Sequence, residues 1–153
     1  MTREETGADD LLGLDTQVCF ALHTTARAFD ALYRSVLRDL GLTYPQYLAM
    51  LALWERDGAT VKELGARLRL DSGTLSPLIK RLQVAGLVER RRGTRDERSV
   101  SVHLTSRGLA LKAEAAGVPR RIMAASGLDH AELAELHALL RRTTDHLDAA
   151  IHT

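Results

Sequence analysis

The sequence predicts a mainly α-helical fold with one small β-hairpin, a winged helix-turn-helix, and three observations in residues 60–104 support this prediction. First, Thr60 and Glu63 have the T-x-x-E spacing of a capping box that starts a helix. Second, apolar residues recur at helical spacing on both sides of a turn at Leu70–Gly73. Third, two strand-like segments follow, joined by a polar turn.

The second helix of this segment is expected to have two unlike faces. Its apolar stripe contains Leu75, Leu78, Ile79 and Leu82, and Gly86 is placed to end it. The other face carries small polar residues first and cations behind them: Ser72, Gly73, Thr74, Ser76, Lys80 and Arg81. Short hydroxyls at a helix N-terminus can meet phosphates and base edges, so this helix is predicted to read DNA in the major groove.

The hairpin is expected at residues 87–92 and 98–104, where the second segment alternates through Val100, Val102 and Leu104. The turn between them, Gly93–Glu97, is too polar to belong to a core. We therefore interpret it as the tip of a wing.

The charge distribution agrees with DNA binding. From Lys62 to Arg98 there are ten Lys or Arg residues against five Asp or Glu, a local charge of +5 in a chain whose net charge is +1. A basic segment on a nearly neutral protein is typical of phosphate binding. A run such as Arg90–Arg92 alone is more often a solvated surface, so the helix-turn-helix pattern decides the interpretation.

Length and composition bound the remaining possibilities. We expect a flexible tail at residues 1–12 and a single domain at 13–153, with its DNA-binding part at about 43–104. No apolar run approaches the roughly 20 residues that span a bilayer, and the acidic N-terminus lacks a signal-peptide pattern. We therefore expect a cytoplasmic protein with no membrane partner.

Amphipathic helices are predicted at both ends, over about 15–40 and 105–151. The first is expected to start at Asp15 as N-cap and to end at Gly41, and Pro119 is expected to bend the C-terminal region. A D-x-x-E box at Asp129 starts the last helix, whose apolar face reaches Ile151. Such faces need a partner, so we interpret them as the dimerisation layer of a homodimer on a near-palindromic operator.

A metal site is not predicted. The chain has six histidines, and His130 and His137 are seven residues apart, about 10 Å along a helix. That separation is too large to share one ion, and the usual zinc-ligand spacing is absent from the sequence. We predict no metal and no cofactor.

The one cysteine, Cys19, lies near the start of the first helix, where the helix dipole favours a thiolate. A lone cysteine in such a helix is usually a small core residue. Its context differs here, because LDTQVCFALHTTARAF, LTYPQYLAMLALWE, the recognition-helix segment and DERSVSVHLT together resemble the MarR family of winged-helix repressors. Within that family the QVCFAL and LTYPQY blocks are similar to the organic hydroperoxide resistance regulators (OhrR), and the similarity covers about residues 13–150.

The resemblance implies a peroxide sensor of the one-cysteine type. In such regulators the residue matching Cys19 is oxidised, two tyrosines matching Tyr33 and Tyr44 hydrogen-bond it, and a small cellular thiol completes the switch. The wing arginine of the family matches Arg98, which Asp96 would orient, and we place Arg95 with them among the DNA-binding residues. The sequence departs from several relatives at His23, where they carry tyrosine.

Helix geometry adds a constraint of its own. Tyr33 follows Cys19 by fourteen residues, close to four turns, so both lie on one face of a straight helix about 21 Å apart. No tyrosine hydroxyl spans that distance. If Tyr33 contacts a Cys19, that cysteine belongs to the other subunit, with the two first helices antiparallel.

Three functions remain open at this stage. The first is a repressor that senses organic hydroperoxides through Cys19. The second is a MarR-type repressor released by a small phenolic or drug-like ligand, with Cys19 incidental. The third, a thiol peroxidase, is disfavoured because nothing in the chain would regenerate the thiol and the DNA-binding segment would be unexplained, so we do not expect an enzyme.

Overall fold

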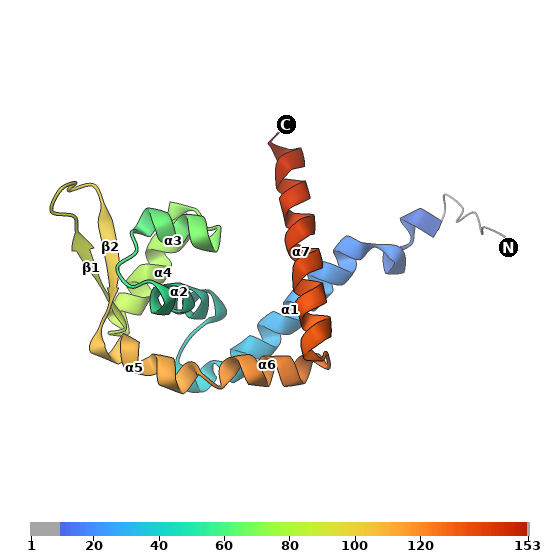
Figure 1. Ribbon diagram of the computed structural model, residues 1–153, viewed down its shortest axis with the longest axis horizontal. Coiled ribbons are helices and arrows are strands. Elements are labelled where there is room, and N and C mark those ends of the chain that lie inside the picture. The colour runs from blue at the N-terminus through green and yellow to red at the C-terminus, as the bar shows by residue number, and fades with distance from the viewer. Residues whose placement is uncertain (1–9, 153) are drawn as a thin grey trace. The chain divides into compact units, whose positions relative to one another are not determined.

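The computed structural model of the chain describes residues 10–152, and it divides into two compact units, Met1–Ala116 and Gly117–Thr153. The single domain expected over residues 13–153 stays a prediction. The expected tail at residues 1–12 falls mostly outside the described residues, and its last three, Asp10–Leu12, form a 3-10 helix. Figure 1 shows the elements of both units in chain order.

The first unit contains most of the secondary structure. Its helices and strands are η1 (Asp10–Leu12), η2 (Leu14–Thr16), α1 (Val18–Val36), η3 (Arg38–Leu40), α2 (Tyr44–Glu55), α3 (Val61–Leu68), α4 (Ser72–Val84), β1 (Val88–Arg92), β2 (Val100–Leu104) and α5 (Ser106–Ala115). The second unit contains α6 (Val118–Ser126) and α7 (His130–Ile151). The prediction of a mainly helical fold with one hairpin is confirmed.

The helix-turn-helix begins where its capping residues predicted. The backbone N–H of Glu63 donates to Thr60 Oγ1 at 3.1 Å, and Glu63 Oε2 accepts from the Thr60 N–H at 2.8 Å, which completes the capping box of α3. Asp71 caps α4 by accepting from the Thr74 N–H at 2.7 Å. Helix α4 ends before Gly86, whose φ of 76° lies in the left-handed region that glycine adopts without strain.

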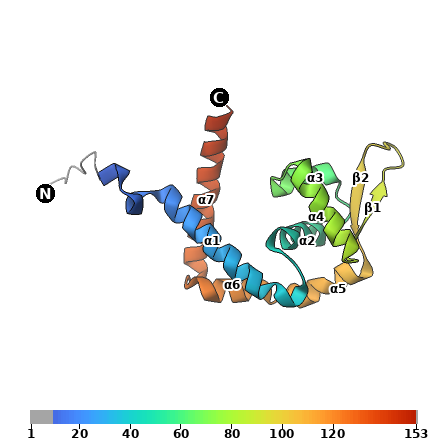
Figure 2. The ribbon, with the colours of Figure 1, turned by 180° about the vertical axis from the view of Figure 1, so that it is seen from behind.

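The core of the first unit lies between α2, α3, α4 and the hairpin. Helix α4 packs against α3 and β1. Figures 1 and 2 show α2, α3 and α4 beside the hairpin. The fully buried side chains of the core include Met50, Leu53, Leu64, Leu75, Ile79, Leu82, Val88 and Val102. The apolar stripe predicted for α4 is thus the face that holds it to the rest of the unit.

The hairpin is antiparallel and is tied to the helices at its base. Strand β1 pairs with β2 from Val88 opposite Leu104 to Arg92 opposite Val100. The Val102 N–H donates to the Ala59 carbonyl at 2.9 Å, and the Leu104 N–H donates to Asp57 Oδ1 at 2.8 Å. These bonds attach β2 to the turn between α2 and α3, so the wing has a fixed base.

Helix α5 packs tightly under the hairpin at Gly108. A Cβ atom at this glycine would lie 2.0 Å from the carbonyl oxygen of Leu87, so no side chain fits there. The Gly108 carbonyl accepts a hydrogen bond from the indole N–H of Trp54 at 2.9 Å. The joint therefore links α2, the start of β1 and α5.

Both ends of the first helix differ from the prediction. Asp15 was expected as its N-cap, but Asp15 lies in η2 and the N-cap of α1 is Gln17. The α-helix ends at Val36 rather than near Leu40, and the chain continues through η3 to Gly41, whose φ is 67°. A short 3-10 turn at each end accounts for the difference, because 3-10 turns commonly flank α-helices.

The second unit is two helices joined by a turn at Gly127, with φ of 72°. The break expected at Pro119 falls earlier, at Ala116–Gly117, and Pro119 lies in the first turn of α6. Asp129 and Glu132 form the capping box predicted for α7. Among the residues that the structure describes, no helix is both long and apolar enough to cross a bilayer.

Candidate DNA interface and redox site

Helix α4 presents the polar face that the sequence predicted. Its predicted DNA-contacting residues are all exposed: Ser72, Gly73, Thr74, Ser76, Lys80 and Arg81. The first three occupy the first turn, which the Asp71 cap leaves facing solvent, and the two cations follow about two turns later. Small hydrogen-bond donors therefore lie at the N-terminal end of α4, and positive charge lies about two turns further along it.

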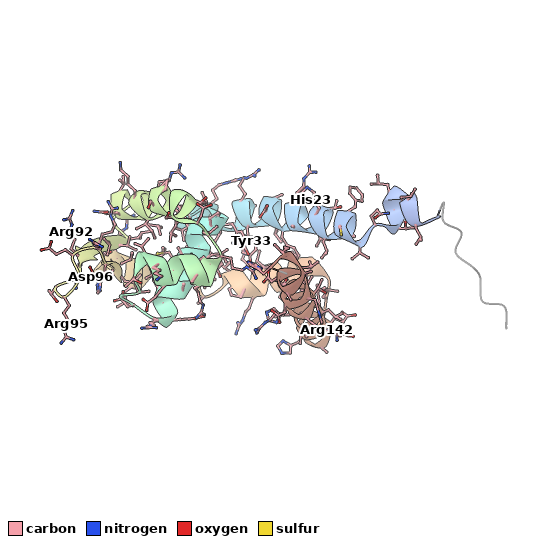
Figure 3. The ribbon with its side chains drawn as sticks, turned by 90° about the horizontal axis from the view of Figure 1, so that it is seen from above. His23, Tyr33, Arg92, Arg95, Asp96 and Arg142 are labelled. Carbon is pink, nitrogen blue, oxygen red and sulfur yellow. The ribbon has the colours of Figure 1, made fainter. Side chains whose placement is uncertain are left out.

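The wing carries its predicted residues in and after its turn. Figure 3 shows Arg95 and Asp96 on the hairpin, with Arg95 pointing away from the neighbouring ribbon. The Arg98 backbone N–H donates to Asp96 Oδ1 at 3.0 Å. This bond joins Asp96 to the backbone of Arg98, whereas the sequence led us to expect a contact with the guanidinium. The carboxylate thus orders the turn from which Arg98 extends.

A groove of about 430 Å³ lies between the wing and the helix-turn-helix. It is lined by residues from α3, α4 and the hairpin: Thr60, Val61, Lys62, Ser76, Arg90, Asp96, Arg98, Ser99 and Val100. Lys62 and Arg90 were not among the predicted site residues, although the basic segment included both. Arg90 is positioned by its Nε–H, which donates to Gln83 Oε1 on α4 at 2.9 Å. Cations from α3 and from the hairpin thus converge on one groove.

Cys19 is the second residue of α1 and is exposed. The side-chain amide of the N-cap residue, Gln17, donates to the carbonyls of Leu11 at 2.7 Å and Gly13 at 3.1 Å. Gln17 therefore anchors the preceding turns and does not cap the helix with its side chain. Because α1 begins at Val18, Cys19 lies in its first turn. The backbone N–H groups of a first helical turn have no intrahelical acceptor and favour negative charge.

Tyr33 and Tyr44 come together although they lie on different helices. Their ring centroids are 4.3 Å apart with planes inclined at 29°, and Tyr47 lies 5.9 Å from Tyr33. Tyr47 is a buried core residue and also belongs to this cluster. The three-residue spacing of Tyr44 and Tyr47, which puts both on one helix face, was the signal for it.

The environment raises the pKa of all three phenols. Burial, together with the neighbouring Tyr44 and Tyr47, raises the pKa of Tyr33 to about 12. Burial first and the Asp30 carboxylate second raise the pKa of Tyr44. Burial, followed by Tyr44, raises the pKa of Tyr47. At neutral pH each phenol keeps its proton, as a free tyrosine also does, and each hydroxyl can donate a hydrogen bond to an anionic sulfur.

One uninterrupted helix separates Cys19 from Tyr33. Both residues lie on α1, and the fourteen-residue interval corresponds to about 21 Å of rise. The structure confirms the continuous helix on which the sequence argument depended. The tyrosine pair therefore does not meet the cysteine of its own chain.

Metal-binding groups do not gather in the described part of the chain. No three His, Cys, Asp or Glu side chains of residues 11–152 lie together as ligands of one ion.

The chain is similar in sequence to known transcriptional regulators. The family model described as "Transcriptional regulator SarA/Rot" matches residues 31–115. The chain is 49% identical over 136 residues to the HTH-type transcriptional regulator TtmR of Methylorubrum extorquens, covering 89% of this chain and 68% of TtmR. It is 43% identical over 131 residues to the organic hydroperoxide resistance transcriptional regulator of Bacillus subtilis, covering 86% of this chain and 89% of that protein.

Solved structures show the same fold. Reduced AbfR bound to DNA, from Staphylococcus epidermidis, matches with a TM-score of 0.72 and 35% sequence identity, covering 88% of this chain and 93% of AbfR. The exposed polar face of α4, the basic wing and these relatives all indicate a DNA-binding regulator. The chain belongs to the winged-helix, SarA/MarR-type transcriptional regulators, a family of DNA-binding proteins and not of enzymes.

Proposed function

We propose that this chain is a repressor that binds a near-palindromic operator as a homodimer and releases it when an organic hydroperoxide oxidises Cys19. The observation that carries the proposal is the stacked pair of protonated phenols, Tyr33 and Tyr44, on the unit whose first helix holds the only cysteine. The similarity to the Bacillus subtilis organic hydroperoxide resistance regulator supports it.

The proposed chemistry starts with the Cys19 thiolate. It attacks the terminal oxygen of the hydroperoxide, the O–O bond breaks, and the alkoxide leaves and takes a proton from water, which gives a sulfenic acid on Cys19 and the corresponding alcohol. Hydroxyl donors from Tyr33 and Tyr44 of the partner subunit stabilise the thiolate before the attack. Cys19 is exposed on the single chain, and apolar surroundings supplied by the proposed dimer interface would favour alkyl hydroperoxides over hydrogen peroxide, because the alkyl group gains by leaving water.

The proposed dimer explains apolar residues that the folded chain leaves in solvent. Val18 is 72% exposed on α1, and Leu147 and Ile151 are 58% and 76% exposed on α7. Helix α7 has no buried side chain at all within the described residues. Apolar faces of this length usually mark an interface. Sedimentation equilibrium at micromolar concentration is expected to give a dimer, and a stable monomer would contradict the shared sensor.

The proposed DNA contacts divide by role. Residues of the first turns of α4, including Ser72, Thr74 and Ser76, face base edges in the major groove, and Lys80 and Arg81 contact phosphates. Arg98 enters the minor groove from the wing, flanked by Arg95 and held by the turn that Asp96 orders. Two-fold symmetry would repeat these contacts on a second half-site.

A gel-shift titration tests the sensor. Reduced protein is bound to its operator and treated with cumene hydroperoxide, in parallel with Cys19→Ser, which replaces only the sulfur. The parent protein is expected to release DNA, and Cys19→Ser to bind with parental affinity and stay bound. If peroxide releases Cys19→Ser equally well, the repressor is gated by a small phenolic or drug-like ligand and Cys19 is incidental.

A further inference from the structure

A second hollow lies directly beside the tyrosine pair. It has a volume of about 350 Å³ and is formed where the last turns of α1 face the start of α2. Its lining residues are Asp30, Arg34, Leu42, Thr43, Tyr44 and Pro45. Tyr44 is therefore both a wall of this pocket and the residue that stacks on Tyr33 at 4.3 Å. A molecule seated in the pocket would touch the proposed redox site.

The pocket carries one charge of each sign. Asp30 and Arg34 are four residues apart on α1, a spacing at which opposite charges on a helix usually pair. Within residues 11–152, however, no ion pair joins them. The Asp30 carboxylate is instead close enough to Tyr44 to raise its pKa. Both charges remain available to a ligand, beside the apolar side chains of Leu42 and Pro45.

A carboxylate and a guanidinium that line one pocket suit the two charges of a small zwitterion. The ammonium group of an α-amino acid is suited to Asp30, and its carboxylate to the planar fork of Arg34. Thr43 is already engaged in capping α2, where its hydroxyl accepts from the Gln46 N–H at 3.4 Å. The recognition elements of the pocket are thus the two charges and the phenol.

The chemistry of a lone cysteine indicates which reactive group the ligand must carry. A sulfenic acid condenses with a thiol to a disulfide, and without a thiol it is open to irreversible oxidation. The sequence contains one cysteine, so its own chain provides no second thiol. The thiol that protects Cys19 must come from another molecule.

We infer that the pocket formed by Asp30, Arg34 and Tyr44 binds the amino-acid end of a small cysteine-based thiol and delivers its sulfur to the oxidised Cys19 of the partner subunit. This inference rests on the proposed function. In the step, the thiol sulfur attacks the sulfenic sulfur, an S–S bond forms, the S–O bond breaks, and the hydroxyl leaves as water with the thiol proton. The two sulfurs end as a mixed disulfide, and the hydroperoxide has been the oxidant.

The test compares thiols that differ in charge. Full-length protein is oxidised with one equivalent of cumene hydroperoxide, and sulfenic acid is confirmed by dimedone trapping and mass spectrometry. The rate of mixed-disulfide formation is then measured with L-cysteine, with 3-mercaptopropionate, which lacks the ammonium group, with cysteamine, which lacks the carboxylate, and with 2-mercaptoethanol, which lacks both. Each rate is divided by the rate of the same thiol with a chromogenic disulfide, which removes differences in intrinsic reactivity.

Three variants show where any preference resides. Arg34→Gln is expected to slow L-cysteine and 3-mercaptopropionate at least about five-fold, the size of one solvent-accessible charge-assisted contact, and to leave 2-mercaptoethanol unchanged. Asp30→Asn should slow L-cysteine and cysteamine, and it provides an independent test if Arg34→Gln folds poorly. Arg38→Gln is the matched control, because Arg38 is exposed one turn further on and does not line the pocket.

The outcomes distinguish failure of the pocket assignment from failure of the proposed peroxide sensing by Cys19. Equal corrected rates for L-cysteine and 2-mercaptoethanol, or an equal loss for every thiol in Arg34→Gln, would overturn the pocket assignment while leaving peroxide sensing intact. Failure to form any sulfenic acid on Cys19 would overturn the sensor and the pocket together. A loss in Arg38→Gln as large as that in Arg34→Gln would show general electrostatic attraction in place of a site.

Discussion

Replacing Gly108 by alanine tests the joint that holds α5 beneath the wing. The new Cβ would lie 2.0 Å from the Leu87 carbonyl oxygen and 3.0 Å from its carbon, whereas carbon–oxygen contacts normally begin at about 3.3 Å. The helix must move by roughly 1 Å, which strains the 2.9 Å Trp54 bond to the Gly108 carbonyl. Overpacking of this kind costs about 3 kcal/mol.

This loss of stability corresponds to a measurable fall in Tm. For a chain of 153 residues each kcal/mol shifts Tm by about 2–4 °C, so Gly108→Ala is expected to lower Tm by roughly 6–12 °C. Differential scanning calorimetry at fixed protein concentration measures it, because an associating protein has a concentration-dependent Tm. The emission of Trp54, the single tryptophan, reports whether the joint itself has opened.

Gly117→Ala is the matched control. Gly117 has helical backbone angles, and a Cβ built there meets no atom within 4 Å, so alanine should be neutral or slightly stabilising. If Gly108→Ala is as stable as Gly117→Ala, the close approach of α5 to Leu87 does not constrain the fold and the reasoning is wrong.

Three further predictions concern DNA and the tyrosines. Arg98→Ala should weaken operator binding at least about ten-fold in a gel shift while the circular dichroism spectrum is kept, and unchanged affinity would remove Arg98 from the interface. Lys80→Ala should weaken specific and non-specific binding alike and lower the slope of log affinity against log salt by about one, whereas an unchanged slope would mean that Lys80 contacts no phosphate. Tyr33 should ionise near pH 12, against 10.0 for a free tyrosine, so the stability it contributes is complete below about pH 10 and is lost as the pH rises through about 12. Ultraviolet difference titration of the parent protein against Tyr33→Phe isolates this step, and a difference titration centred near pH 10 would show that Tyr33 is not shielded.

The elements that sequence reasoning located correctly are those whose signals are local. The boxes at Thr60 and Asp129 each satisfy their own backbone groups within four residues, so the sequence alone marks where α3 and α7 begin. The N-cap predicted at Asp15 was wrong because the local residue type did not decide where α1 begins. An aspartate is a good N-cap by type, but a 3-10 turn formed around it and moved the start of α1 to Gln17, a residue type that rarely caps helices.

The parts of the site that escaped prediction depend on distant contacts. Tyr33 and Tyr44 could be named through resemblance, but their stacking requires the chain to reverse at η3 and Gly41, which no spacing rule specifies. Lys62 and Arg90 were visible as charges, yet only the register of β1 and its bond to Gln83 bring Arg90 to the same groove as Lys62. The pocket at Asp30 and Arg34 likewise exists only because α2 turns back on α1.

The straight run of α1 also determines which changes of chain length the protein can accept. Each added residue turns the following part of a helix by about 100° and moves it about 1.5 Å, so one insertion between Cys19 and Tyr33 would rotate them onto different faces. Four insertions would nearly restore the rotation and add about 6 Å to the separation. Loops such as the wing turn can lengthen without altering this relation, whereas the number of residues in α1 sets the distance on which the proposed sensor depends.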